Sequence, residues 1–233
     1  MRDKLVFTDV HGCGHELQEV ISSNIGCDFI SLGDNFDRAF DGVLVYELLR
    51  DHEVTCVMGN HDLKLLDYLR GDRDWIPKSY QYFLKQFTNK YDVKDLISFL
   101  EKMKIIHTFD IATRRVIAVH AGIRVDDPLL EDVSCNVYGR SEHQSDDWWN
   151  FYHGKDLVLY GHITHESPVA TRWDGEVNSI CLDTGVCHGK KLSAMRLSTS
   201  GSASFISVNS KKDYFTEFKR KLLKPLTHPS PHV

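Results

Sequence analysis

The sequence lacks several features that would assign it to a special class. Its six cysteines are scattered and form no Cys-x-x-Cys pair, which argues against a disulfide framework or a zinc knuckle. No apolar run approaches the roughly eighteen residues of a membrane span, and the first apolar run begins at Leu5, which leaves no space for a signal peptide. The net charge of −5 provides no basic surface for coating a nucleic acid. These absences predict a cytoplasmic protein with no membrane association and no stable nucleic-acid partner.

The composition of the chain favours one large domain. Its 233 residues, 42% apolar and 26% charged, are enough for a sizeable core. We expect a catalytic domain at residues 1–210, followed at 211–233 by a basic helix and a proline-containing tail that frays. The basic helix would bury one face, which carries Phe215, Phe218 and Leu222.

The first half of the chain alternates between strand-like and helix-like segments. Apolar, β-rich runs predict strands at residues 5–10, 28–32, 54–58, 116–120 and 157–160. Helical patterns between them predict helices at residues 16–23, 43–50, 63–70, 80–87 and 93–103. From Pro168 onward, short runs separated by turns predict an antiparallel meander. The simplest architecture consistent with these elements is an α/β fold in which two mixed β-sheets pack as a sandwich flanked by helices.

Polar residues follow the five predicted strands at their carboxyl ends. Ligand sites lie at this edge of open α/β sheets, because loops leave the sheet there and helix N-termini point toward it. The six candidate metal ligands are Asp9, His11, Asp34, Asn60, His120 and His162. Two carboxylates, one amide and three imidazoles suit divalent ions of intermediate hardness, and they are too many for one ion that keeps an open position. We therefore predict two divalent ions that share a carboxylate, with Mn²⁺ expected and Fe²⁺ or Zn²⁺ as alternatives.

The motifs that contain these residues resemble a known family. In chain order they are Asp9-x-His11, Gly33-Asp34-x-x-Asp37-Arg38, Gly59-Asn60-His61-Asp62, His120-Ala121-Gly122 and Gly161-His162. Together they resemble the calcineurin-like metallophosphoesterases, and the G-D-x-x-D-R element is similar to that of the phosphoprotein-phosphatase type. The short length and the H-A-G form further resemble a branch with two members. These are the short bacterial and bacteriophage serine/threonine phosphatases and the symmetrical diadenosine tetraphosphatases.

The resemblance implies a calcineurin-like metallophosphoesterase fold and a ligand set for each ion. Asp9 and His11 would bind the first ion, and Asp34 would bridge both ions. The second ion would be completed by Asn60, His120 and His162. Many other metallophosphoesterases end in G-H-x-H, but here His165 lies one residue farther along, so an extended chain would point it elsewhere. Whether His165 binds metal stays open at this point.

The resemblance also implies four catalytic residues. His61 would be the general acid that protonates the leaving oxygen, and Asp37 would hold its imidazole. Arg38 and Arg140 would bind the phosphate, although Arg140 is matched only by its position between His120 and His162. Elementary chemistry supports these roles, since a guanidinium matches phosphate oxygens bidentately and a poor alkoxide leaving group needs a proton donor.

Three hypotheses about function remain. The first is a metal-dependent serine/threonine protein phosphatase, with dual specificity as a variant, that hydrolyses phosphomonoesters with a hydroxide held by both ions. The alternative is a symmetrical diadenosine tetraphosphate hydrolase or a related nucleotide phosphohydrolase. We favour the first because the chain is short and shows no obvious basic pocket for a second nucleotide half. A non-enzymatic binding module is the third, and it would have lost residues such as His61 that this chain retains.

Overall fold

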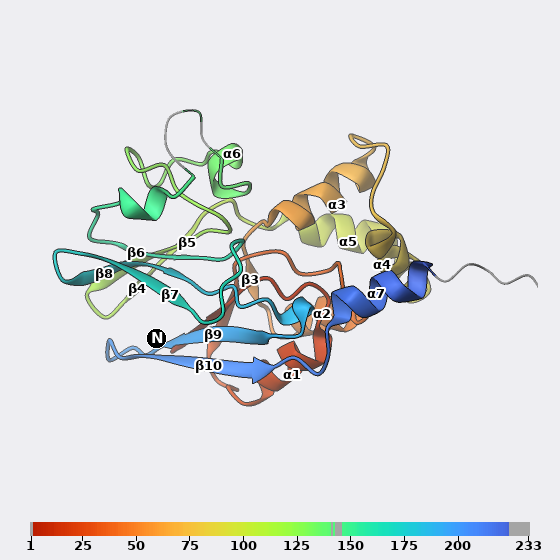
Figure 1. The fold of residues 1–233 in the computed structure, drawn as a ribbon, viewed down its shortest axis with the longest axis horizontal. Helices are drawn as coiled ribbons and strands as arrows, with labels where there is room; N and C mark the ends of the chain where they lie inside the picture. The colour runs from red at the N-terminus through yellow and green to blue at the C-terminus, as the bar shows by residue number, and fades with distance from the viewer. Residues whose placement is uncertain (1, 141, 143–145, 224–233) are drawn as a thin grey trace, which may run out of the picture.

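The computed structural model describes residues 2–140, 142 and 146–223, and over these residues it contains two five-stranded mixed sheets (Figure 1). The first sheet contains, in spatial order, β10 (Ala203–Asn209), β9 (Lys191–Leu197), β1 (Lys4–Phe7), β2 (Asp28–Ser31) and β3 (Thr55–Cys56). The second contains, in the same sense, β4 (His107–Ile111), β5 (Arg114–Ala118), β6 (Leu157–Tyr160), β8 (Glu176–Cys181) and β7 (Val169–Trp173). The predicted α/β fold with two mixed sheets is confirmed.

Helices fill the connections between the strands of the first half. They are α1 (Gly14–Ser22), α2 (Gly42–Asp51), α3 (Asn60–Arg70), α4 (Lys78–Thr88) and α5 (Val93–Glu101). Capping residues determine where some of these helices begin and end. At the start of α5, the Asp92 side chain accepts a hydrogen bond from Lys94 N. At the end of α3, Gly71 has a φ of 85°, which only glycine adopts readily. Four shorter or later elements follow: α6 (Val133–Asn136), the 3-10 turns η1 (Trp148–Asn150) and η2 (Val186–His188), and α7 (Tyr214–Leu223).

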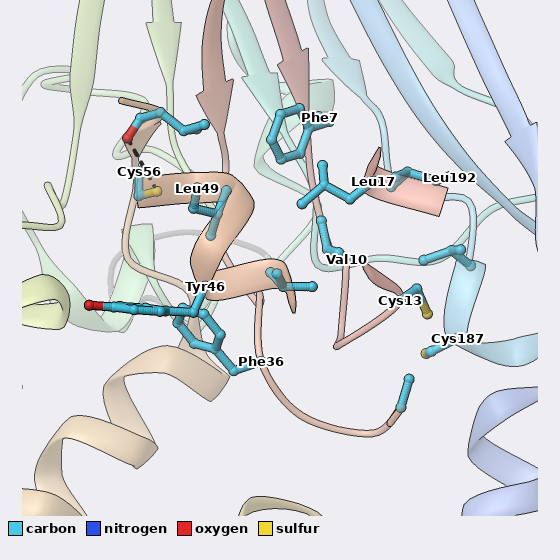
Figure 2. Close-up of a cluster of buried hydrophobic side chains, with 14 of the residues drawn as sticks. Phe7, Val10, Cys13, Leu17, Phe36, Tyr46, Leu49, Cys56, Cys187 and Leu192 are labelled. Atoms are coloured by element: carbon cyan, nitrogen blue, oxygen red, sulfur yellow. Dashed lines mark hydrogen bonds between the residues drawn. The ribbon is translucent and has the colours of Figure 1, made fainter. Parts of the chain in front are cut away.

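Strand residues alternate between two apolar layers. In β1, Leu5 and Phe7 belong to the core beneath the helices, whereas Val6 belongs to the core between the two sheets. Figure 2 shows Phe7 converging in the helix-side layer with Leu17 from α1 and Leu49 from α2. Because both faces of these parallel strands are buried, their sequences are continuous apolar runs, and this is why the strands were visible from sequence.

Two features differ from the sequence-based prediction. The strand β4 was not expected, since its alternating exposed residues make a short and weak apolar pattern. The predicted meander is divided between the sheets: β7 pairs with β8 in the second sheet, and β9 pairs with β10 in the first. The connection from β8 to β9 crosses from one sheet to the other, so the four strands form two hairpin-like pairs instead of one meander.

The helix α7 packs beside α4 on the side of the molecule where α3 and α5 also lie (Figure 1). The Phe218 ring lies 5.3 Å from the Phe40 ring and 5.5 Å from the Tyr82 ring, measured between centroids. The side chain of Leu222 and the prolines at 225, 229 and 231 lie outside the described residues. None of the helices in the described part of the chain has the length and apolar character needed to span a membrane.

Candidate active site

The chain turns sharply where β1, β2 and β6 end, and several of the predicted site residues lie in these turns. Five of them have positive φ angles: Asp9, His11, Asp34, Arg38 and His162. A left-handed backbone costs an L-residue roughly 1–2 kcal/mol, so it persists only where surrounding contacts enforce it. Such strain at five neighbouring polar residues marks a functional site, because a core needs no such conformations.

Two glycines allow the turns to approach each other. A Cβ atom on Gly59 would collide with Asp34 Oδ1, and one on Gly161 would collide with Asp9 Oδ2. Each glycine directly precedes a candidate ligand, Asn60 in one turn and His162 in the other. The motifs therefore need glycine at these positions so that ligands from different strands can meet.

Asp62 fixes the loop that carries Asp34. Its carboxylate accepts hydrogen bonds from Asp34 N at 2.8 Å, Asn35 N at 3.0 Å and Gly59 N at 3.2 Å. The sequence analysis named Asp62 only as the last residue of its motif and assigned it no task. Its position three residues after Gly59, at the start of α3, is the signal that identifies a capping carboxylate.

The first imidazole group consists of His11, Asp37 and His61. Asp37 Oδ1 lies 2.8 Å from His11 Nδ1, and Asp37 Oδ2 lies 2.8 Å from His61 Nδ1. Burial alone would raise the pKa of Asp37, but the His61 and His11 imidazoles outweigh it and hold the pKa well below its usual range. Asp37 is therefore ionised, and each imidazole directs its Nε2 away from it, toward the centre of the site.

His61 has two further contacts that decide its chemistry. Arg38 Nη2 lies 3.0 Å from His61 Nε2, and the buried Tyr80 hydroxyl lies 2.9 Å from His61 Nδ1. Burial lowers the pKa of His61, but the neighbouring carboxylates of Asp37 and Asp34 raise it by more, so the net shift is upward. An imidazole with a raised pKa that a carboxylate holds on Nδ1 suits a general acid, and its Nε2 becomes available to a leaving oxygen once Arg38 no longer donates to it. Tyr80 was missed from sequence because it belongs to a different helix, α4, and no motif marks it.

The second imidazole group consists of His120, His162 and Asn60. His120 Nδ1 donates to Leu32 O at 2.9 Å, so the lone pair of His120 Nε2 faces His162 Nδ1 at 3.2 Å and Asn60 Oδ1 at 3.1 Å. Burial lowers the pKa of both imidazoles to about 3, so both are neutral at pH 7. Neutral imidazole nitrogens that lie beside an amide oxygen form a donor set that fits a cation. If the amide of Asn60 turns over, its nitrogen donates to these atoms instead, which is the arrangement suited to the ion-free protein.

Asp34 lies between the two groups. Its Oδ2 atom is 3.5 Å from His120 Nε2 and 3.7 Å from His11 Nε2. Two ligand atoms bound about 2.1 Å from one ion at tetrahedral angles lie roughly 3.4 Å apart. The spacing on both sides of Asp34 therefore fits one ion on each side, as expected for a bridging carboxylate.

The buried carboxylates also fit bound cations. Asp9, Asp34 and His120 offer ligand atoms that all lie within 4.8 Å of one another, as do His11, Asp37 and His61. In the second set the Asp37 oxygens are already hydrogen-bonded to imidazole nitrogens, so we assign it to positioning. Burial raises the pKa of Asp9 and of Asp34 above the ordinary value, a cost that two divalent ions would remove.

Two residues considered in the sequence analysis, Arg140 and His165, lie outside both imidazole groups. Arg140 is exposed and lines a cavity of about 440 Å³ together with Asn60 and His162, so it lies at the rim of the site instead of in its centre. His165 belongs to neither group of candidate ligands found among the described residues, and its backbone N–H donates to Asp183 O at 3.0 Å.

Comparisons with known proteins agree with this geometry. A family model described as "Calcineurin-like phosphoesterase" matches residues 4–189. A bis(5'-nucleosyl)-tetraphosphatase PrpE, asymmetrical, from Oceanobacillus iheyensis is 26% identical over 248 residues, which cover 91% of this chain and 94% of that protein.

Two solved structures show the same fold. A candidate diadenosine tetraphosphatase is 20% identical with a TM-score of 0.62, covering 90% of this chain and 94% of its own. A serine/threonine phosphatase from Saccharomyces cerevisiae is 11% identical with a TM-score of 0.55, covering 88% of this chain and 79% of its own. At these identities the likeness extends to the fold alone.

Proposed function

The chain belongs to the calcineurin-like phosphoesterase family and is a metal-dependent phosphoesterase, and from this premise we propose that it hydrolyses dinucleoside polyphosphates such as diadenosine tetraphosphate. The relative from Oceanobacillus iheyensis, which matches nearly its whole length, is named for this activity. This proposal takes up the alternative hypothesis of the sequence analysis and moves the favoured protein phosphatase to second place. We further propose asymmetrical cleavage, which yields ATP and AMP, in place of the symmetrical cleavage named in that alternative hypothesis.

The observation that carries the proposal is a pair of cavities, one lined by residues of each imidazole group. One, of about 370 Å³, adjoins His61 and contains the cations Arg38, Lys78 and Lys219. The other, of about 440 Å³, adjoins Asn60 and contains Lys64 and Arg140. The sequence analysis disfavoured a dinucleotide because it found no second basic pocket. Two basic cavities that flank one centre suit a substrate with a nucleoside at each end of a phosphate chain.

Each residue then has a definite task in the proposed reaction. Two divalent ions, of which Mn²⁺ is our candidate, would be held by Asp9, His11, Asp34, Asn60, His120 and His162. When bound, they supply the positive charge that activates water near neutral pH and stabilises the charge developing on the phosphate. Arg38 and Arg140 bind phosphate oxygens from opposite sides of the site. His61, held by Asp37, delivers a proton to the departing oxygen.

A side-by-side assay tests the proposal. The protein, supplied with Mn²⁺, is given diadenosine tetraphosphate, a phosphoserine peptide and a 2',3'-cyclic nucleotide, and kcat/KM is measured for each. We expect the dinucleotide to be preferred by at least about tenfold, with equal amounts of ATP and AMP as products. A higher kcat/KM for the phosphopeptide would return the protein-phosphatase hypothesis to first place. Formation of ADP alone would refute asymmetrical cleavage while leaving the substrate class intact.

A further inference from the structure

Resting on the proposed function, we propose that α7 and the start of α4 form a subsite for the AMP that departs when water adds to the neighbouring phosphorus and the bond from that phosphorus to the AMP phosphate oxygen breaks. The helix α7 lies beyond residue 189, where the match to the family model ends, so the family likeness assigns it no role. Three of its residues, Phe215, Phe218 and Lys219, nevertheless line the same cavity as His61. From the start of α4 the cavity receives Pro77, Lys78 and Ser79.

The charge of this cavity suits a phosphate-bearing ligand. Arg38, Lys78 and Lys219 contribute three positive charges, and Asp37 is the only acidic residue that lines the cavity within the described part of the chain. Both carboxylate oxygens of Asp37 are already engaged by imidazoles. The cavity therefore presents a net positive charge, which attracts the phosphate of a nucleotide.

An aromatic ring gives the cavity a surface for a base. The half-buried Phe215 ring has Lys219 Nζ at 4.0 Å from its centroid and Arg38 Cζ at 5.6 Å. The His188 ring meets it edge-on at 5.0 Å and holds its orientation. A purine that displaces the exposed Lys219 ammonium would stack on Phe215, and the ammonium would then lie close to the phosphate of the same nucleotide.

Position and size indicate which part of the substrate enters. The nucleophile and the leaving oxygen lie roughly in line across phosphorus, so the leaving group departs on the side of the proton donor. That side is the His61 side, where this cavity opens. Small-molecule pockets span about 300–1,000 Å³, and a cavity of about 370 Å³ lies at the small end of this range, which favours one nucleotide over the whole dinucleotide.

The test compares variants of one helix on two substrates. Phe215→Ala and Lys219→Ala remove the proposed contacts, and Arg220→Ala is the matched control, since Arg220 is an exposed cation of the same helix that does not line the cavity. With Mn²⁺, kcat/KM is measured for diadenosine tetraphosphate and for p-nitrophenyl phosphate, whose leaving group carries neither a base nor a phosphate.

We expect the ratio of the two kcat/KM values to fall about tenfold in Phe215→Ala and about threefold in Lys219→Ala, mainly through KM for the dinucleotide. Arg220→Ala should keep the wild-type ratio, and Phe215→Tyr should restore it. If the wild-type protein cleaves the dinucleotide but both cavity variants keep its ratio, the subsite is refuted and the proposed function stands.

A second measurement tests the subsite even if the proposed function is wrong. If the wild-type protein does not cleave the dinucleotide, AMP is tested as an inhibitor of p-nitrophenyl phosphate hydrolysis. A subsite for a nucleotide predicts inhibition that weakens about tenfold in Phe215→Ala and not in Arg220→Ala. Absence of inhibition by AMP, or equal inhibition of both variants, would overturn the subsite.

Discussion

The two imidazole groups of the active site share one carboxylate and differ in what satisfies their polar atoms. In the group of His11, Asp37 and His61, a proton lies in each short contact, because one ionised carboxylate accepts from both rings. In the group of His120, His162 and Asn60, His120 Nε2 lies 3.1 Å from the Asn60 amide and 3.2 Å from His162 Nδ1, and among the described residues no carboxylate accepts from either ring there. We propose His61 of the first group as the acid and His11 as a metal ligand, whereas the second group contains only proposed metal ligands. Because His11 and His61 make the same contact with Asp37, the proposed task of each ring depends on what its other nitrogen faces.

The largest expected effect comes from the carboxylate that joins the groups. Asp34→Ala should lower kcat/KM roughly 10⁴-fold, because losing several kcal/mol of charge stabilisation corresponds to such a factor. The number of bound Mn²⁺ ions per chain, measured by elemental analysis after dialysis, should fall below two. Asp110→Ala, on the exposed side of β4, is the control and should bind metal normally. Two retained ions with wild-type activity in Asp34→Ala would show that the groups are independent.

His61→Asn should impair acid catalysis and leave metal binding intact, because it removes the proposed general acid and none of the proposed metal ligands. We expect kcat to fall about 10³-fold for phenyl phosphate, which has a poor leaving group, within the usual range for acid catalysis, while the metal content stays at two ions. The loss should be much smaller for p-nitrophenyl phosphate, whose better leaving group departs without a proton. Equal losses on both substrates would contradict the role of His61 as the acid.

Asp62→Asn should weaken both groups through the loop that carries Asp34. Replacing the carboxylate with an amide leaves one or two of the three backbone N–H groups without their acceptor, and outer residues of this kind contribute about 10- to 100-fold in activity or metal affinity. Activity and the dissociation constant for Mn²⁺ are the measurements. Asp62→Glu keeps the charge and should recover most of the loss. An unaffected Asp62→Asn protein would mean that the turns hold Asp34 without this acceptor.

The smallest expected effect is that of Tyr80→Phe, because this variant removes only one contact of His61, the proposed general acid. Losing one hydrogen bond to His61 costs about 0.5–1.5 kcal/mol, which corresponds to a two- to tenfold decrease in kcat. KM and metal content should not change. Tyr82→Phe on the same helix is the control, because its hydroxyl contacts Gln86 and not the site. A larger effect in Tyr82→Phe than in Tyr80→Phe would remove Tyr80 from the acid group.

Much of this site was predictable because the candidate ligands directly follow the strands in the sequence. Apolar runs buried on both faces are visible in a sequence, and the polar residues that follow them, such as Asp34 and His120, must leave the sheet at the same edge. The antiparallel half was harder to predict. Strands β8 and β9 are adjacent in sequence and equally apolar, and no local property states that the chain changes sheets between them.

Residues that support the site from other elements could not be predicted. Tyr80 reaches His61 from α4, and Phe215 reaches the adjoining cavity from α7, far along the chain. These contacts depend on how helices pack, which amphipathic patterns do not specify. Arg140, matched by position alone, lies at the rim of a cavity, and its distance from the centre could not be foreseen from spacing.

The position of β1 has a consequence for how the protein is made. This strand pairs with β2 on one side and with β9 on the other, so β1 leaves the ribosome long before one of its two neighbours. Until residues 191–197 are synthesised, β1 presents an open apolar edge of the kind that promotes aggregation. The loop that bears Asp9 and His11 follows directly from β1, so we expect the candidate site to assemble only after β9 has been made. Nascent chains that stop before β9 should therefore depend on chaperones to stay dispersed.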